Sequence, residues 1–163
     1  MGDVNPLAAR LLRSTIVTGV SDGLFSSVLV TVFYGSTFAR LWQGVASILL
    51  GRGVIDGGTR YVLVGLVMHF CVACGWSAVF LFIVSRAAWV RGLLRSRFGV
   101  ARVAAIYGPC VWLTMSLVII PLFTHRWVPA NWLRWGIQLV GHFPFVGIPI
   151  VWSIGKDTET VSS

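Results

Sequence analysis

The sequence predicts an all-α fold: a four-transmembrane-helix bundle with a short interfacial or re-entrant helix between the first and second spans. Composition is the first reason. Hydrophobic residues make up 56% of the 163 residues, whereas charged residues make up only 11%. Because soluble domains carry about 25% charged residues, this surface suits lipid better than water. A chain of this length forms one integral membrane domain, residues 1–163.

Four hydrophobic stretches are long enough to be spans, since about 20 helical residues cross ~30 Å of hydrocarbon. They are residues 14–36, 60–85, 103–123 and 136–154. Prolines within the last two stretches are expected to bend those helices, because proline lacks a backbone N–H. These prolines are Pro109, Pro121, Pro144 and Pro149.

The connection between the first two spans is too apolar for a plain loop and too short for another crossing. Residues 38–50 are expected to form the short helix, after which several glycines return the chain to the second span. Gln43, Ser47 and Gly51 are spaced four apart on one face of this helix. That face either lines a vestibule or packs as a polar edge against the span ends.

The basic residues predict an orientation. They lie between hydrophobic runs, which is typical of topology determinants and of contacts to anionic lipid, so we expect the bilayer and not nucleic acid as a partner. One side carries eight: Arg10, Arg13, Arg86, Arg91, Arg95, Arg97, Arg102 and Lys156. The other side carries five: Arg40, Arg52, Arg60, Arg126 and Arg134. Asp56 is expected to hold Arg52 and Arg60. The positive-inside rule then places both termini in the cytoplasm, with the chain in a bacterial inner membrane.

Tryptophans support the span boundaries. Six of the eight fall at or beyond predicted span ends, where amphipathic rings favour the head-group region. They are Trp42, Trp89, Trp127, Trp132, Trp135 and Trp152. Trp76 and Trp112 lie nearer the middle of their spans, so their indole N–H groups need partners or an opening.

Small residues spaced four apart predict close contact between the first two spans, because they let helix backbones approach. The first span has this spacing at Gly19 and Gly23, and the second has it at Gly65, His69 and Ala73. We expect the glycines and Ala73 to be helix-packing positions. A polar stripe beside the first set should point into the bundle. It comprises Thr15, Thr18, Asp22 and Ser26.

Asp22, His69 and His142 form a candidate intramembrane polar relay. An ionised carboxylate inside a span costs about 2.5–3.5 kcal/mol, so Asp22 should be paired, hydrated or protonated. The helical rise places the three at about 12, 16 and 21 Å above the cytoplasmic edge, within reach of one another through side chains or water. The alternative is one buried hydrogen bond that sets helix register, with His142 capping a carbonyl freed by Pro144 or Pro149.

Apart from these three residues, the chain has few side chains of the types that bind metals or cofactors. Cys71 and Cys74 match C-x-x-C, but inside a hydrophobic helix we expect them and Cys110 to be inert packing residues. His69 lies about 200° around the helix from Cys71, so we expect no metal site and no bound cofactor. A haem held by His69 and His142, or a bound quinone, is a third functional possibility.

Several short glycine-rich motifs extend the pattern. They are Gln43–Gly44–Val45–Ala46–Ser47, Gly51, Gly57–Gly58, Gly65, His69, Tyr107–Gly108, Pro121, His142 and Pro149. Over residues 40–152 the chain resembles small four-span bacterial inner-membrane proteins of the YagU-like type, whose activity is not established. The resemblance implies a multi-pass inner-membrane protein. It supplies no catalytic residues, and Asp22 lies outside its motifs.

The sequence therefore favours a non-enzymatic protein. Nothing in it resembles a nucleophile elbow, a phosphate-binding glycine loop or paired catalytic carboxylates. The leading interpretation is an accessory or scaffold protein that binds a membrane-protein partner or a second copy of itself. The alternative is a small proton-coupled transporter or channel that uses Asp22 and His69.

Overall fold

The computed structural model describes residues 5–125 and 131–155. Within these ranges the secondary structure is entirely helical, and four helices are long and apolar enough to cross a membrane. They are Pro6–Phe33, Thr59–Arg86, Gly99–Thr124 and Trp132–Gly155. The predictions of an all-α fold and of four long hydrophobic helices are therefore confirmed.

The first long helix consists of α1 (Pro6–Val28) and a π-helical turn, Leu29–Phe33. It begins well before the predicted residue 14 because Pro6 has the backbone angle of a first helical residue. The Asn5 side chain also accepts a hydrogen bond from the Leu7 N–H at 2.9 Å and so caps the helix. The helix ends at Phe33 and not at the predicted residue 36, since Gly35 takes a φ of +61°.

The short connecting helix is present as α2 (Phe38–Leu50), which confirms the helix predicted for residues 38–50. Gly51 ends it with a φ of +80°. Gln43 then fixes the return of the chain: its Nε2 donates to the Gly58 carbonyl at 3.2 Å, and its Oε1 accepts from the Asp56 N–H at 3.0 Å. Gln43 is thus a packed polar clamp, whereas Ser47 and Gly51 line a pocket described below.

The prediction that Asp56 holds Arg52 and Arg60 is wrong. Its two carboxylate oxygens accept hydrogen bonds from Arg40 of α2, at 3.1 and 2.9 Å. Arg60 instead lies over the Tyr61 ring, 4.6 Å from its centroid. The Asp56 side chain lies next to α2 because the chain turns at this residue. Asp56 has a φ of +68°, and its backbone N–H is held by the Gln43 side chain. The hydrogen bonds from Arg40 lower the pKa of the Asp56 carboxyl group.

The basic connection after α3 (Thr59–Arg86) contains a short helix that the sequence analysis did not predict, α4 (Ala88–Leu94). Arg91 explains part of its position. Its Nη1 donates to the carbonyls of Val84 and Ser85, at 2.6 and 3.1 Å. These carbonyls belong to the last turn of α3, where helix carbonyls lack intrahelical partners and attract cations.

Each of the last two long helices is interrupted by a π-helical turn. α5 (Gly99–Thr114) passes through Met115–Ile119 into α6 (Ile120–Thr124), and α7 (Trp132–His142) passes through Phe143–Gly147 into α8 (Ile148–Gly155). These turns adjoin or contain three of the prolines expected to bend the spans. Because proline removes one hydrogen bond from the helix, the backbone widens next to it.

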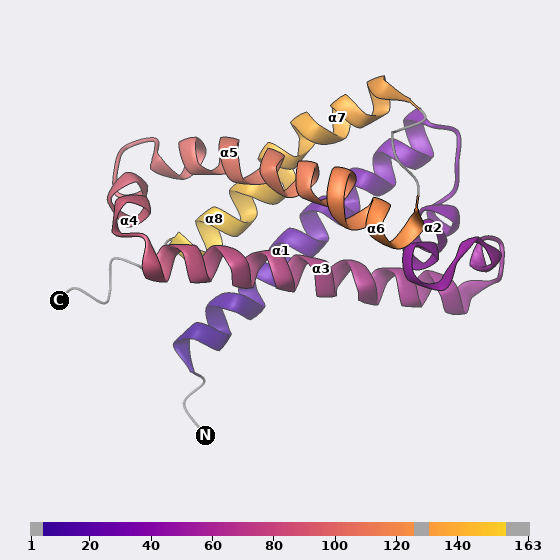
Figure 1. Cartoon of the computed structure of the whole chain (residues 1–163), viewed down its shortest axis with the longest axis horizontal. Helices are drawn as coiled ribbons and strands as arrows, with labels where there is room; N and C mark the ends of the chain where they lie inside the picture. Colours follow the sequence, from indigo (N-terminus) through magenta and orange to yellow (C-terminus); the bar gives the residue numbers. More distant parts are fainter. Residues whose placement is uncertain (1–4, 126–130, 156–163) are drawn as a thin grey trace.

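The long helices pack obliquely against one another (Figure 1), and the packing of the interior differs between the two ends of the molecule. α1 crosses α3 and also contacts α8, while α5 packs against α7 and α8. α4 lies at one end of the molecule and α2 at the other. Toward α4, the interior is a dense core in which Phe80, Ile150, Val151 and Ile154 are almost completely buried. Toward α2, the interior is hollow.

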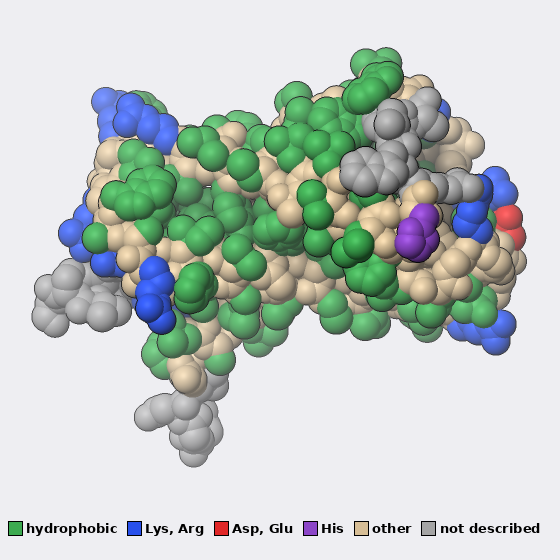
Figure 2. Space-filling view, in the orientation of Figure 1, with side chains coloured by type: hydrophobic (Ala, Val, Ile, Leu, Met, Phe, Trp, Pro, Cys, Tyr) green, Lys and Arg blue, Asp and Glu red, His purple; other side chains and the backbone are tan. Residues whose placement is uncertain are grey.

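The outer surface is apolar along its middle. Large hydrophobic side chains on all four long helices are exposed there, including Leu24, Val67, Phe82, Ile106 and Val140. On the face shown in Figure 2, hydrophobic side chains cover the middle, and Arg side chains gather at the two ends. This is the surface of a membrane protein. Arg126, Trp127 and Lys156, which entered the sequence-based predictions, lie outside the described residues.

Candidate functional site

A cavity of about 470 Å³ occupies the hollow half of the molecule. All four long helices and α2 contribute to its wall, which is mostly apolar. Its polar side chains are Thr18, Asp22, Ser26, His69, Gln138 and His142. Val111, Val146 and Ile150 line the cavity and also belong to the dense core, so they form a floor toward the α4 end. The structure thus brings all three candidate relay residues to one cavity.

Asp22 and His69 lie close together in the wall of this cavity. Oδ2 of Asp22 lies 4.0 Å from Nδ1 of His69, and both side chains are mostly buried, with 16% and 14% of their areas exposed. The other ring nitrogen, Nε2, lies 2.9 Å from the Gly19 carbonyl oxygen. Since a carbonyl only accepts hydrogen bonds, Nε2 carries the proton. Nδ1 of a neutral His69 is therefore a proton acceptor directed at Asp22.

His142 is oriented in the same way by a backbone carbonyl. Its Nδ1 lies 2.7 Å from the Gln138 carbonyl oxygen, so Nδ1 donates and Nε2 remains a proton acceptor. The carbonyl is not that of Val140 or Phe145, which lie four residues before Pro144 and Pro149. The prediction that His142 caps a carbonyl freed by a proline is therefore wrong. The imidazole of His142 instead donates to the carbonyl of Gln138, one turn earlier in the same helix. Asp22 lies within electrostatic range of both imidazoles.

Glycines on α1 make these contacts possible. A Cβ atom on Gly23 would lie 3.4 Å from the Trp42 ring and 3.5 Å from Nε2 of His69. A Cβ on Gly19 would overlap the Phe70 ring, which is the neighbour of His69 on α3. Ala73, at 6% exposure, lines the cavity from the same helix. The predicted packing residues thus lie where α1, α2 and α3 meet around Asp22.

Trp42 is the residue that sequence reasoning placed wrongly. It was expected at the head-group region, but it is only 2% exposed and lines the cavity. Its ring lies 5.0 Å from the His69 ring, centroid to centroid. The cause is Gly65, whose missing side chain lets the Trp42 backbone rest directly on α3. The position of Gly65 in the second span was visible in the sequence, but its partner on α2 was not.

The contact between the third and fourth long helices was also missed. A Cβ on Gly108 would overlap the His142 carbonyl, and a Cβ on Gly147 would approach the Ala104 carbonyl. These close approaches set the position of His142 and of Gln138 one turn earlier. Ala104 and Gly108 have the same spacing of four as the predicted packing stripes, so the signal was present in the sequence.

Several buried polar atoms at the cavity have no hydrogen-bond partner among the described residues. They are Asp22 Oδ1, Thr18 Oγ1, Trp42 Nε1 and Trp112 Nε1. Buried polar groups in folded proteins are usually satisfied, because each one left without a partner costs about 1–3 kcal/mol. The cavity therefore offers both hydrogen-bond donors and acceptors to a guest.

The residues present do not fit a haem held by two histidines. Nε2 of His69 is bonded to Gly19, Nδ1 faces Asp22, and the ring packs edge-on against Trp42 and Phe70, at 5.0 and 5.7 Å between centroids. Neither nitrogen is directed at a site that a macrocycle would occupy. In the described ranges, no three His, Cys, Asp or Glu side chains form a group that could hold a metal ion.

Comparisons with models of protein families, with curated proteins and with solved structures find no match for this chain. The chemistry of the site follows from its own atoms. They are one carboxyl group, two imidazole nitrogens with fixed acceptor roles, and an apolar wall rich in tryptophan. Such a site can hold a proton between Asp22 and His69 while it encloses a mostly apolar guest.

Proposed function

We propose that the four long helices all cross the bacterial inner membrane, with both termini in the cytoplasm. The hydrophobic middle and the arginine-rich ends support four crossings. The larger number of basic residues on the side of α4 supports the orientation. The relationship to YagU-like proteins stays a prediction from short motifs.

We further propose that the protein is a small proton-coupled transporter. One observation carries this: the tautomer of His69 is set by Gly19, so that Nδ1 points at Asp22 inside a cavity. When the imidazole is neutral and the carboxylate is charged, Nδ1 of His69 and the Asp22 oxygens are all hydrogen-bond acceptors. One added proton would therefore allow a hydrogen bond between the two side chains. Either Asp22 is protonated and donates toward Nδ1, or His69 is protonated and pairs with the carboxylate. At 4.0 Å, a small movement or one bridging water completes the contact.

The cavity also explains how such a proton can be exchanged. It is closed toward the α4 end by the dense core and extends toward the α2 end, where it shares Ile48, Leu49, Trp112, Ile120 and Phe123 with a second pocket. Protons and guests therefore reach Asp22 from the side of α2. A scaffold role alone gives no reason for one cavity to hold a carboxylate, two imidazoles and buried polar groups that have no partner among the described residues. These features favour the transporter over the accessory protein.

Proton flux tests the proposal. The full chain is reconstituted into liposomes with a trapped pH-sensitive dye, and a pH gradient is imposed while the membrane potential is clamped. We expect flux above that of protein-free vesicles, and Asp22→Asn should reduce it to that background. The matched control is Asp56→Asn, which removes an exposed carboxylate of the loop after α2 and should keep the flux.

Infrared spectroscopy gives a readout that does not need a transported guest. The wild-type protein should show a pH-dependent band of a protonated carboxyl group that is lost in Asp22→Asn and kept in Asp56→Asn. Equal flux and identical bands in wild type and Asp22→Asn, with both proteins folded by size-exclusion chromatography, would contradict the transporter proposal.

A further inference from the structure

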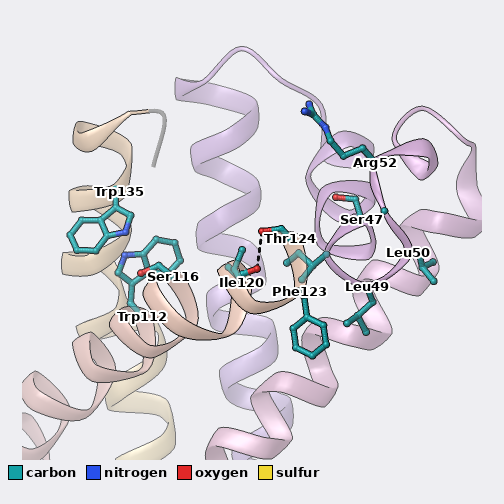
Figure 3. A pocket seen from close by; sticks show the side chains of 12 residues that line it. Ser47, Leu49, Leu50, Arg52, Trp112, Ser116, Ile120, Phe123, Thr124 and Trp135 are labelled. Carbon is teal, nitrogen blue, oxygen red and sulfur yellow. Dashed lines mark hydrogen bonds between the residues drawn. The ribbon is translucent and has the colours of Figure 1, made fainter. Parts of the chain in front are cut away.

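A second pocket, of about 870 Å³, lies between α2 and the third and fourth long helices (Figure 3). It is separate from the Asp22 site, although the two share part of their walls. Its lining residues come from the last turns of α2 and the two residues after it, Gly51 and Arg52, and from the segment that runs from Trp112 through α6, together with Trp135 of α7. None of these groups belongs to the proposed proton relay.

Three hydrogen-bonding groups of this pocket are buried and have no partner in the part of the chain that the structure describes: Nε1 of Trp112, Nε1 of Trp135 and Oγ of Ser116. The two indole rings are neighbours, with centroids 6.4 Å apart. Figure 3 shows the three side chains grouped on one side of the pocket, across from Arg52. An indole N–H only donates, and a serine hydroxyl can donate as well. These three side chains could therefore donate hydrogen bonds to one oxygen atom, or to oxygen atoms of one group, on a bound molecule.

The charge of the pocket has one sign. Arg52 lines it and, among the described residues, pairs with no carboxylate, and the lining includes no Asp or Glu. The other hydroxyl groups are already satisfied: Ser47 donates to the Gly44 carbonyl at 2.7 Å, and Thr124 donates to the Ile120 carbonyl at 2.8 Å. The pocket thus keeps three N–H and O–H donors without a partner among the described residues, together with one positive charge and no carboxylate in its lining, a combination that favours an anionic oxygen group.

The rest of the wall is hydrocarbon. Leu49, Leu50 and Phe123 border the pocket with about half of their area exposed, at 55%, 53% and 52%. Ile48 and Ile120 continue the apolar wall into the inner cavity. An anionic group bound by Trp112 and Trp135 would therefore have an apolar wall beside it, against which an attached hydrocarbon chain could pack.

We propose that this pocket binds an amphiphile with an anionic oxygen head group and a hydrocarbon chain. The head group accepts hydrogen bonds from Trp112, Trp135 and Ser116 and is attracted by Arg52, and the chain lies along Leu49 and Phe123. A free fatty acid and an acidic membrane lipid both have this chemistry. The inference does not depend on proton coupling at Asp22, because it uses neither Asp22 nor the two histidines and is tested by binding alone.

Saturable binding to the full chain in neutral detergent tests the proposal. The probes are radiolabelled dodecanoate, dihexanoyl phosphatidylglycerol, dodecyltrimethylammonium and inorganic phosphate. Trp135→Phe keeps an aromatic ring and removes one donor, so the Kd of the anionic amphiphile should rise about tenfold. Ser116→Ala should weaken binding in the same direction with less effect on packing. Arg52→Gln should weaken it about threefold, since this side chain is exposed.

Matched controls are available at the same end of the molecule. Trp132→Phe changes an exposed tryptophan of the same helix, and Arg60→Gln changes an arginine outside the pocket, so both should bind as wild type does. Binding of dodecanoate alone assigns a free fatty acid, and binding of the phosphatidylglycerol assigns a bilayer lipid. Equal binding of dodecyltrimethylammonium, or an unchanged Kd in both Trp135→Phe and Ser116→Ala, would overturn the proposal.

Discussion

At the scale of single residues, backbone carbonyls set the tautomers of both histidines. The Gly19 carbonyl already belongs to the α1 hydrogen-bond ladder, yet its second lone pair accepts Nε2 of His69. The absence of a side chain on Gly19 leaves room for the neighbouring Phe70 ring, so α3 approaches closely enough for this bond. Gly19 therefore acts on the chemistry of the cavity and not only on helix packing.

A double-mutant cycle measures the coupling between Asp22 and His69. Asp22→Asn and His69→Ala should each destabilise the protein, but their effects should not add, because either change alone removes the shared interaction. We expect a coupling of about 0.5–3 kcal/mol in the free energy of unfolding, measured in detergent. Asp22→Asn combined with His125→Ala provides the comparison, since His125 lies beyond α6 and outside the cavity lining. Additive effects in both cycles would show that Asp22 and His69 do not interact.

A pH dependence is expected at Asp56 and Arg40. Hydrogen bonds from Arg40 lower the pKa of Asp56 from its usual 3.8, so the pair stabilises the loop above that pH. The contribution is lost as pH falls from about 3.8 through the lowered folded-state pKa. Hydrogen-exchange protection of residues 55–58, corrected for intrinsic exchange rates, should therefore decrease over this window. Arg40→Gln should abolish the decrease; if the variant keeps it, another group is responsible.

At the scale of elements, glycine contacts hold the helices around the cavity. Gly65 allows α2 to rest on α3, and Gly108 and Gly147 allow the third and fourth helices to meet next to His142. At each contact, the backbone of a neighbouring helix occupies the space that a side chain on the glycine would fill. A backbone cannot move aside as a flexible side chain can. The cavity is thus enclosed by rigid contacts on both sides.

Two glycines of α3 give a matched test. A Cβ on Gly65 would collide with the Trp42 backbone, whereas a Cβ on Gly75 would meet no atom within 4 Å. Gly65→Ala should therefore lower the free energy of unfolding by about 1–3 kcal/mol. Gly75→Ala should leave it unchanged or raise it, because alanine favours the helix. Thermal unfolding in detergent compares the two, and equal stability would mean that α2 does not pack on α3 in this way.

The elements were largely predictable because hydrophobic length is a strong local signal. The four spans and the helix at residues 38–50 follow from it. The exact ends did not, since they depend on Asn5, Pro6 and Gly35, whose capping effects compete with hydrophobicity. α4 was missed because its seven residues are too few for a periodic pattern, and Arg91 secures it through contacts with α3.

At the scale of the whole molecule, the site was predictable only as a set of residues. Asp22, His69 and His142 stood out because ionisable groups are costly inside a span. Trp42 and Gln138 did not stand out, because their positions depend on which helix faces meet. The outer pocket was indicated only by the vestibule alternative for the face with Ser47 and Gly51. A helix that is apolar on all sides has no polar face that shows which side points inward. Its sequence alone therefore does not show which of its faces contacts the neighbouring helix.

The orientation predicts the result of a topology experiment. A reporter fused after Ser163 should report the cytoplasm, and one inserted near Ala130 should report the outside, because more basic residues lie on the α4 side. Alkaline phosphatase and a fluorescent protein, which are active on opposite sides, give complementary signals. The reverse pattern would invert the orientation and place the opening of the cavity toward the cytoplasm.

The position of Asp22 on the first long helix has a consequence for biogenesis. Ribosomes complete this helix before they make α3, whose His69 reaches the carbonyl of a residue 50 positions earlier in the chain. During that interval the acid has no imidazole partner, so the nascent helix meets the translocon with its carboxyl group exposed to lipid or still in water. Protonation removes that insertion penalty. Synthesis of α3 then brings His69 next to Asp22, so the order of synthesis is part of how this pair is assembled.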